Sequence, residues 1–290
     1  MELEKNLGIF LAGHRDSVYS LAITGDVQTL VSAGADRTIR IWDLISGQQK
    51  SILKGHSDWV YSVAISPDSQ FIVSGSFDKT LKVWDLDNGE LIHTLSGHSD
   101  RVYSVAISPD GQTVFSGSKD TSIKVWNIEN GKLLETLTTP SDWVYALAIS
   151  PDGRSIVSGC ADGKIQIGNE TILTRHSGSV TSLAISPDGK TLVSGSIEEN
   201  IKLSNLETGQ QSATLAGHAD GVTSLAISQD GKIIASGGND KIVKVWDRIT
   251  GRMINAFAGH LRAVMAVAIS PDGKKIVSGS RSDVIKIWQI

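Results

Sequence analysis

The stretch Gly55-His-Ser-Asp-Trp-Val-Tyr-Ser-Val-Ala-Ile-Ser-Pro-Asp68 decides the fold, because versions of it recur along the chain at a fixed interval. The Gly-His pair returns in steps of 42 residues, at His14, His56, His98, His218 and His260. Pro140 and His176 hold the two intervening positions, and only the interval between these two is shorter, at 36 residues. Seven copies of one unit therefore fill the chain, and this period predicts a stacked or circular repeat architecture.

Each copy contains four short runs rich in Val, Ile, Thr and Tyr, separated by turn residues such as Ser66-Pro67-Asp68. This pattern predicts antiparallel β-strands and no helix. In the first run, Tyr61, Val63 and Ile65 are expected on one face, with Ser and Ala on the other. Both faces must then be covered, and four-stranded sheets packed around an axis cover them while leaving only short edges.

The pairs Gly55-His56 and Trp84-Asp85 within one copy resemble the signature of the WD-repeat family, and the resemblance covers essentially the whole chain. The close similarity among copies resembles that of repetitive bacterial members. The resemblance implies an all-β fold, a seven-bladed β-propeller of four-stranded antiparallel blades. Residues 285–290 match a third strand and residues 7–11 match an outer strand, so the N-terminal strand is expected to complete the last blade and close the ring. The expected blades span residues 14–53, 56–95, 98–137, 140–173, 176–215, 218–257, and 260–290 with 7–11.

Composition narrows the possible partners and the compartment. The net charge is −4 and no run of Lys or Arg occurs, so we expect neither a nucleic-acid nor a membrane partner. Cys160 is the single cysteine and is expected to be a buried thiol. No apolar stretch could span a membrane, and the start Met-Glu-Leu-Glu-Lys has no signal-peptide pattern, so a cytoplasmic location is expected.

Four copies carry His, Ser, Asp and Trp at fixed offsets, which are partly the residue types of a Ser-His-Asp hydrolase. A nucleophile is needed once, however, and these serines lack the Gly-X-Ser-X-Gly elbow. The resemblance instead implies a buried hydrogen-bond chain from Asp through His and Ser to the Trp indole, with each link contributing about 1 kcal/mol. We therefore expect no catalytic residue, no metal site and no cofactor. The four sets, called tetrads below, are His14, Ser32, Asp36 and Trp42; His56, Ser74, Asp78 and Trp84; His98, Ser116, Asp120 and Trp126; and His218, Ser236, Asp240 and Trp246.

The remaining copies carry incomplete tetrads. The replacements are Pro140 and Gly168 in blade four, Glu198 and Ser204 in blade five, and Ser282 in blade seven. Blade four also lacks six residues of its outer hairpin, where Asn169-Glu170 stands. Blades four and five are therefore expected to open first.

A binding site is expected where the copies differ. All four tyrosines occupy one repeat position on four consecutive copies, and the resemblance implies that this position faces the channel mouth. Clusters of Tyr, Trp and Arg are typical of binding hot spots, and several WD-repeat proteins hold a peptide side chain, often a basic one, at this place. The alternative that these rings only pack against the next blade stays open. The expected partner-binding residues are Tyr19, Tyr61, Tyr103, Tyr145, Trp59, Trp143, Arg101, Phe77 and Lys119.

These observations favour a non-enzymatic, monomeric scaffold that binds a protein or peptide on the aromatic face. One alternative is a regulatory or oligomerisation module of a larger assembly that docks through blades four and five. A second is an enzyme that uses the central channel, for which Glu198-Glu199 is the nearest candidate acid–base pair.

Overall fold

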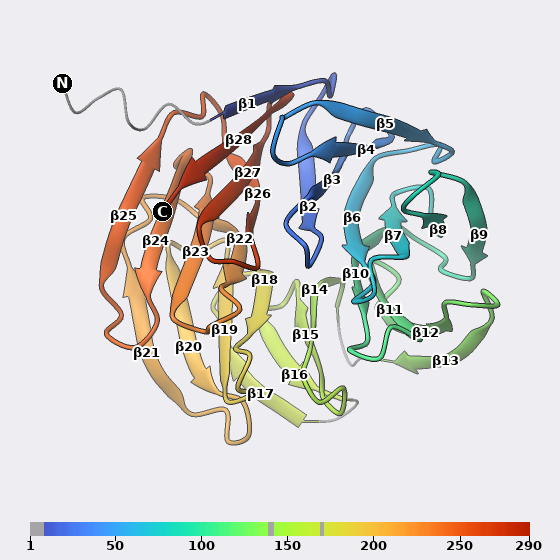
Figure 1. Ribbon diagram of the computed structural model, residues 1–290. Helices are drawn as coiled ribbons and strands as arrows, with labels where there is room; N and C mark the ends of the chain where they lie inside the picture. Colours follow the sequence, from blue (N-terminus) through green and yellow to red (C-terminus); the bar gives the residue numbers. More distant parts are fainter. Residues whose placement is uncertain (1–8, 139–141, 169–170) are drawn as a thin grey trace.

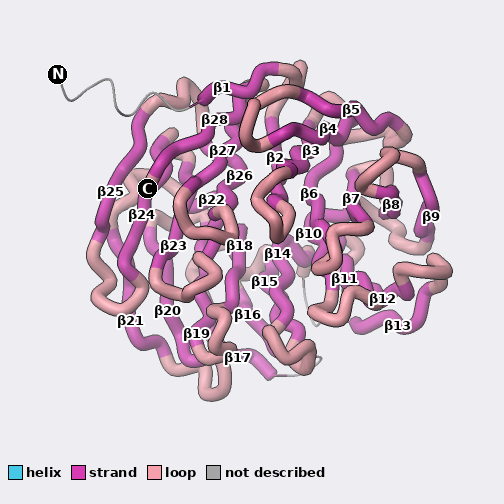
Figure 2. The backbone as a smooth tube through the Cα atoms, viewed as in Figure 1, coloured by secondary structure: helices cyan, strands magenta, loops and turns pink. Residues whose placement is uncertain are grey.

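The computed structural model describes residues 9–138, 142–168 and 171–290, and these contain 28 β-strands joined by turns and loops. The strands form seven antiparallel sheets of four strands arranged in a ring (Figures 1 and 2). The expectation of an all-β, seven-bladed propeller is therefore confirmed.

Each blade begins with an inner strand beside the central channel and ends with an outer strand at the rim (Figure 1). Blade four has the shortest third strand, as its reduced hairpin leads one to expect. The strands of blades one to three are β2 (Val18–Ile23), β3 (Thr29–Gly34), β4 (Thr38–Asp43) and β5 (Gln49–Lys54); β6 (Val60–Ile65), β7 (Phe71–Ser76), β8 (Thr80–Asp85) and β9 (Leu91–Ser96); and β10 (Val102–Ile107), β11 (Thr113–Ser118), β12 (Ser122–Asn127) and β13 (Leu133–Thr138). Those of blades four to six are β14 (Val144–Ile149), β15 (Ile156–Cys160), β16 (Lys164–Ile167) and β17 (Thr171–Arg175); β18 (Val180–Ile185), β19 (Thr191–Ser196), β20 (Asn200–Asn205) and β21 (Gln211–Ala216); and β22 (Val222–Ile227), β23 (Ile233–Gly238), β24 (Ile242–Asp247) and β25 (Met253–Ala258).

The two ends of the chain meet in blade seven. Its sheet contains β26 (Val264–Ile269), β27 (Lys275–Ser280), β28 (Val284–Gln289) and the N-terminal β1 (Ile9–Ala12). β1 pairs antiparallel with β28 in the register Leu11↔Ile285, and Leu11 is 1% exposed (Figure 1). The predicted closure of the ring by the N-terminal strand is confirmed, and it pairs two edges that would otherwise be open.

The core is divided into seven apolar clusters, one between each pair of neighbouring blades. A tryptophan from one of the two blades is part of five of these clusters. The clusters between blades three and four and between blades four and five contain none, because Gly168 and Ser204 stand at the tryptophan positions. Since a large buried side chain contributes several kcal/mol, these two interfaces lack a contribution that the other five have.

Serine side chains also join the inner strands of neighbouring blades. At five of the seven junctions, a serine Oγ accepts the backbone N–H of the residue 43 positions later, at 2.9–3.1 Å. At the other two junctions, Ala146 and Ala266 occupy the serine position and have no hydroxyl. We call these contacts serine bridges, and the five serines are Ser20, Ser62, Ser104, Ser182 and Ser224.

The glycine of each Gly-His pair is required by close packing against a tryptophan. A Cβ atom built on Gly55 would lie 2.9 Å from the Trp84 ring, and one on Gly13 would lie 2.7 Å from Trp42. Only glycine lets the backbone pass this close to the indole that ends the hydrogen-bond chain. The repeated glycine is therefore explained by packing.

Candidate functional site

In blades one, two, three and six, the four tetrad residues form one continuous hydrogen-bond chain. The His Nδ1 lies 2.7–3.0 Å from the Asp carboxylate. The His Nε2 lies 2.7–2.8 Å from the Ser Oγ, and the Trp Nε1–H donates to the same Oγ at 2.8–2.9 Å. The four serines are fully buried, so these chains stabilise the blades and have no access to a substrate.

The electrostatics of the tetrads follows from this bonding. Burial acts to raise the pKa of Asp36, but the hydrogen bonds and charge of His14 hold that pKa well below its usual range. The same balance lowers the pKa of Asp78 and of Asp120. Each of these aspartates therefore remains a carboxylate that orients its histidine.

Blade four leaves buried polar atoms without partners. Within the described residues, the Ser158 Oγ and both amide atoms of Gln166 have no hydrogen-bond partner. The Trp position is held by Gly168, and no atom of a neighbour lies within 4 Å of where its Cβ would be. Pro140 and Asn169-Glu170 lie outside the described residues.

Blades five and seven are intermediate between these extremes. In blade five, Glu198 takes the Asp position and its Oε2 lies 3.4 Å from His176 Nδ1, while the Ser204 Oγ has no partner within the described residues. In blade seven, the Ser278 Oγ bonds both His260 and Trp288, but Ser282 supplies no carboxylate. Burial and the nearby Lys286 lower the pKa of His260 to about 4.

The proposed acid–base pair Glu198-Glu199 does not form a joint site. Glu198 is turned toward His176 at the Asp position of the repeat, whereas Glu199 is exposed to solvent. Neither carboxylate lines a described cavity. The pair is therefore better explained by the structure of blade five than by catalysis.

The tyrosines reach the channel through a local irregularity in each inner strand. In β6 the register with β7 shifts between Val60 and Ser62, so Tyr61 is left out of the pairing. Val60 and Val63 then pack in the same cluster against blade one, while Tyr61 lines the channel. The expectation that Tyr61 shares a face with Val63 is wrong, because a bulge re-aims the residue that it contains.

The four tyrosines lie side by side around one part of the channel. The ring centroids of Tyr19 and Tyr61 are 4.8 Å apart, those of Tyr61 and Tyr103 are 5.2 Å apart, and those of Tyr103 and Tyr145 are 4.7 Å apart. Phe77 adds contacts of 5.2 Å to Tyr61 and 5.3 Å to Tyr103. Pairs at these distances stabilise each other by about 1 kcal/mol beyond their burial.

Two partly exposed tryptophans pack against these rings at the protein surface. Trp59 stacks on Tyr19 at 5.7 Å and on Phe77 at 5.3 Å, and Trp143 contacts Tyr145 edge-on at 6.1 Å. Trp59 is 39% exposed and Trp143 is 37% exposed. We call the seven rings the aromatic cluster, which consists of Tyr19, Trp59, Tyr61, Phe77, Tyr103, Trp143 and Tyr145.

The nine predicted partner-binding residues differ in their exposure. Tyr103 is only 8% exposed, so it supports its neighbours and presents little surface. The two cations lie on rings of the cluster: the Arg101 guanidinium is 4.6 Å from the centre of Phe77, and the Lys119 Nζ is 4.5 Å from that of Trp143. The protein's own cations thus already cover one face of these two rings.

A cavity of 210 Å³ opens beside the aromatic cluster. Tyr61 and Tyr145 form one side of it, and Thr181, Ile197 and Met265 contribute to the other. No charged side chain lines it. Burial, with the neighbouring Tyr103 and Asp142, raises the pKa of Tyr145 to about 12, so its phenol stays neutral and can donate a hydrogen bond. Ile197 and Met265 were not among the predicted site residues, although Met265 stands at the repeat position of the tyrosines and Ile197 at that of Phe77 and Lys119.

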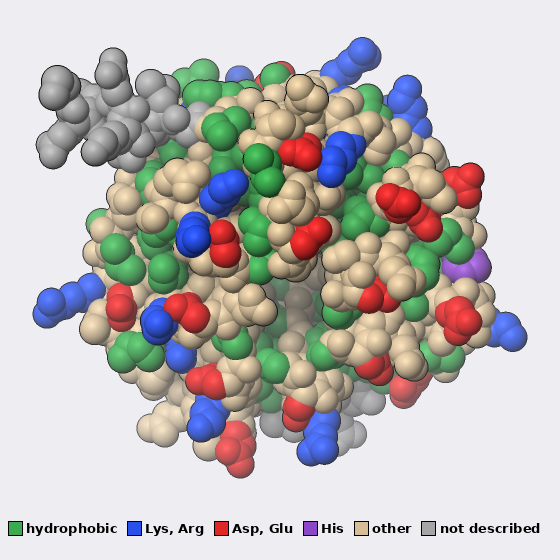
Figure 3. Space-filling view, viewed as in Figure 1, with side chains coloured by type: hydrophobic (Ala, Val, Ile, Leu, Met, Phe, Trp, Pro, Cys, Tyr) green, Lys and Arg blue, Asp and Glu red, His purple; other side chains and the backbone are tan. Residues whose placement is uncertain are grey.

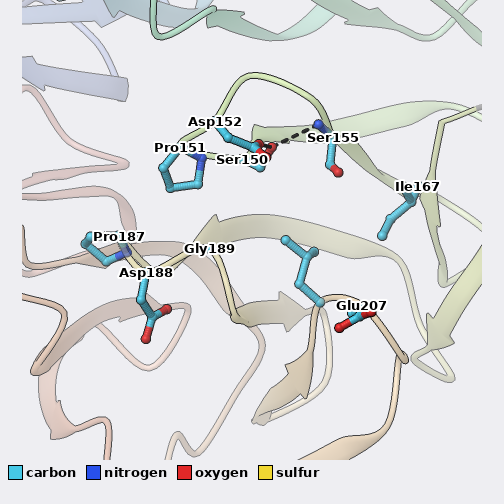
Figure 4. A pocket seen from close by; sticks show the side chains of 10 residues that line it. Ser150, Pro151, Asp152, Ser155, Ile167, Pro187, Asp188, Gly189 and Glu207 are labelled. Carbon is cyan, nitrogen blue, oxygen red and sulfur yellow. Dashed lines mark hydrogen bonds between the residues drawn. The ribbon is translucent and has the colours of Figure 1, made fainter.

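A second cavity, of 470 Å³, lies between blades four and five at the opposite ends of the inner strands. Figure 4 shows Pro151 and Asp152, in the turn after β14, on one side of it, and Pro187 and Asp188, in the turn after β18, on the other. Glu207 adds a third carboxylate. The cavity is therefore acidic at its edge, with apolar surface from the prolines, Ile167 and Leu206.

The closed ring of four-stranded blades defines the protein as a β-propeller. A family model described as WD domain, G-beta repeat (WD40) matches seven segments, residues 5–43, 47–85, 89–127, 131–167, 169–203, 209–247 and 251–289. The chain therefore belongs to the WD40 repeat family. Each matched segment starts at the outer strand of one blade and ends with the third strand of the next, so every repeat ties two blades together. No curated protein matches the chain.

Three further findings concern the described residues. They contain no group of three or more His, Cys, Asp and Glu side chains that could hold a metal ion. No helix among them is long and apolar enough to cross a membrane. Cys160 is a buried free thiol, and burial, with Asp162 and Asp142, raises its pKa to about 11.

Proposed function

We propose that the protein is a non-enzymatic scaffold that binds a protein or peptide partner at the aromatic cluster. The supporting observation is the continuous packing of seven rings that ends in two exposed tryptophans beside an uncharged cavity. Rigid aromatic side chains that are already packed lose little conformational entropy on binding. The position on the channel mouth fits the interaction role that is common in this family.

The chemistry of the site favours an uncharged anchor on the partner. Arg101 and Lys119 already occupy ring faces of Phe77 and Trp143, so a basic side chain would meet like charge there. The cavity instead offers hydroxyl groups and the apolar Ile197. We propose that an apolar or aromatic side chain enters it, while Trp59 and Trp143 cover the adjoining peptide.

The experiment places a photo-crosslinking amino acid at position 59 and, as the control, at Ile249, which is 72% exposed on a distant turn. A partner recovered from the native host should crosslink at position 59 and not at 249. Trp59→Ala and Trp143→Ala should then each weaken binding of that purified partner at least about tenfold. Equal crosslinking at both positions, or unchanged affinity in both variants, contradicts the proposal.

A second candidate function is docking of a larger assembly through blades four and five, favoured by the acidic cavity between them. The occupant we propose is a basic segment of a partner chain. Two of the three carboxylates are already paired within the protein, because the Arg248 Nη2 lies 3.6 Å from Asp188 and the Arg154 Nε lies 4.0 Å from Asp152. Glu207 is the carboxylate of this cavity that such a segment would bind. A crosslinker at Ser155 tests this surface, and Glu207→Gln should weaken that contact without affecting crosslinks at position 59.

We further propose that the protein is a monomer of the cytoplasm. The single buried cysteine with a raised pKa suits a reducing compartment, where free thiols persist. Light scattering measures the oligomeric state directly, and a dimer at micromolar concentration would contradict this part of the proposal.

A further inference from the structure

A third cavity, of 350 Å³, lies on blade one beside Gly55-His56 at the start of blade two and is lined by four cationic side chains. Arg15 follows the His14 of the tetrad, Arg37 lies in the turn between β3 and β4, Arg40 lies on β4, and Lys54 ends β5. Asp36 is the only carboxylate in the lining. The pocket therefore carries a formal charge of +3 on a protein whose net charge is −4.

Arg40 is a buried guanidinium held in a fixed orientation. It is 6% exposed; its Nη1 donates to Gln49, and its Nη2 lies 3.4 Å from Asp36. Its Nε has no hydrogen-bond partner within the described residues. A buried cation is normally satisfied by its surroundings, so the Arg40 Nε–H is a donor for which the described residues provide no acceptor.

Asp36 pairs with Arg40 and does not balance the other three cations of the pocket. Its carboxylate accepts hydrogen bonds from His14 Nδ1 at 3.0 Å, from the Thr38 hydroxyl at 2.7 Å and from the Arg15 backbone at 3.1 Å. In the described part of the chain, no carboxylate lies within 4.0 Å of the charged groups of Arg15, Arg37 or Lys54. The pocket is therefore lined by three exposed cations together with the buried Arg40.

The other six copies have a different residue at the repeat position of Arg40. Five have lysine where blade one has Arg40, and one has glutamine. The lysine amines find partners within the protein: Lys82 donates to Thr94 at 2.8 Å, and Lys124 donates to Thr136 at 3.0 Å. The amines of the other three donate to backbone carbonyls just before their blade, those of Arg175, Gly217 and Gly259. In blade one the residue opposite Arg40 is Ile52, which offers no hydroxyl. No other copy carries cations at all four of these positions.

We propose that this pocket binds a phosphate monoester group. A guanidinium presents a planar set of donors that matches phosphate oxygens, and charge-assisted hydrogen bonds of this kind are the strong ones. The local charge suits a small dianion, while the acidic remainder of the protein disfavours a long polyanion. The group can belong to a phosphorylated segment of a partner protein or to a free phosphorylated small molecule. This site is independent of the aromatic cluster.

The first test is a titration of the isotopically labelled protein with inorganic phosphate, followed by NMR and compared with chloride at equal ionic strength. Phosphate should shift the backbone amides of Arg37, Thr38 and Gly55 in a saturable way. Shifts spread over the surface, or absent from these amides, overturn the proposal.

The variants separate a built site from general surface charge. Arg40→Lys, which installs the residue of the other copies, should weaken phosphate binding about tenfold, because the fork of donors is lost. Arg37→Ala changes only an exposed side chain and should weaken it several-fold, and it keeps the test valid if Arg40→Lys does not fold. Arg154→Ala, an exposed arginine on blade four, is the matched control and should change nothing. Equal effects in all three variants overturn the proposal.

The source of the phosphate is decided with the same variants. A phosphoserine peptide that binds at least about tenfold more tightly than inorganic phosphate, with its unphosphorylated form as control, indicates a protein partner. A phosphorylated sugar that does so indicates a small molecule. Failure of both to bind while Trp59-dependent partner binding persists would refute this site and leave the aromatic scaffold intact.

Discussion

The serine bridges between blades allow one stabilising substitution to be specified. Ser104 in blade three accepts the Leu147 backbone N–H at 3.1 Å, and one blade later Ala146 stands at the same position opposite Leu183. We predict that Ala146→Ser installs the missing bridge between blades four and five. Because those blades also share a cluster without tryptophan, this junction has the most to gain.

The expected change in the free energy of unfolding comes from one new hydrogen bond formed by a hydroxyl at a buried position. A new backbone-to-hydroxyl bond contributes about 1 kcal/mol net. Ala146 is 6% exposed, so a hydroxyl that missed its partner would instead destabilise the protein by about 1–3 kcal/mol. The sign of the effect therefore reports directly whether the bridge forms.

Urea unfolding measures the free energy of unfolding, and hydrogen exchange measures the protection of the Leu183 amide, which should rise about fivefold. Ala148→Ser is the matched control, because Ala148 is similarly buried on the same strand but does not occupy the bridge position. That variant should be destabilised. If Ala146→Ser and Ala148→Ser shift stability alike, or if Leu183 exchange is unchanged, the bridge does not support the junction.

Three further predictions concern the incomplete blades, the pH dependence of stability and a turn with positive φ. Amides in blades four and five should exchange faster than those in blades two and three, and equal protection in native-state hydrogen exchange would contradict the ranking by tetrads. Burial and Lys286 lower the pKa of His260 to about 4 in the folded protein, below its ordinary value of about 6.5 in the unfolded chain. The unfolded chain therefore takes up this proton first, so the unfolding free energy should fall as the pH drops between these values, by at most about 1.4 kcal/mol per unit. Ser282→Asp should flatten this slope in urea unfolding at several pH values, and an unchanged slope would exclude His260 as its origin. Ser69 has a φ of 59°, where Gly111 of the next copy has 74°, so Ser69→Gly should stabilise the protein by up to about 1 kcal/mol, and a lowered melting temperature would refute this.

The fold was predictable from spacing because the repeat unit is visible without any structural information. The 42-residue period predicted the number of blades, and the match of residues 7–11 to an outer strand predicted the closure that β1 and β28 form. The convergence of the tyrosines also follows from the period, because equivalent positions in a ring of copies face one channel. These inferences need only the repeat period and the matching of equivalent positions between copies.

What the sequence did not predict depends on local backbone geometry and on contacts between strands. Alternation placed Tyr61 with Val63, and only the bulge in β6 brings it into the channel. The basic pocket was missed because its cations are dispersed at positions 15, 37, 40 and 54, and no run of Lys or Arg marks it. A comparison of the copies position by position would have found it, since Arg40 is the single arginine at its place in the repeat.

The cavity beside the aromatic cluster also arises from a difference between copies of the repeat. Blades five and six have threonine at the tyrosine position, and the Thr181 hydroxyl donates to the Val222 carbonyl at 2.6 Å, across to the next blade. This bond holds the short side chain against the wall, so the space that a fifth tyrosine would fill remains open. Threonine in place of tyrosine at position 181 thus both adds a hydrogen bond between blades five and six and leaves the cavity open. The tyrosines alone would give a closed stack, and the threonines alone would give a wide, featureless channel, so an anchoring site at this mouth requires that the seven copies be unequal.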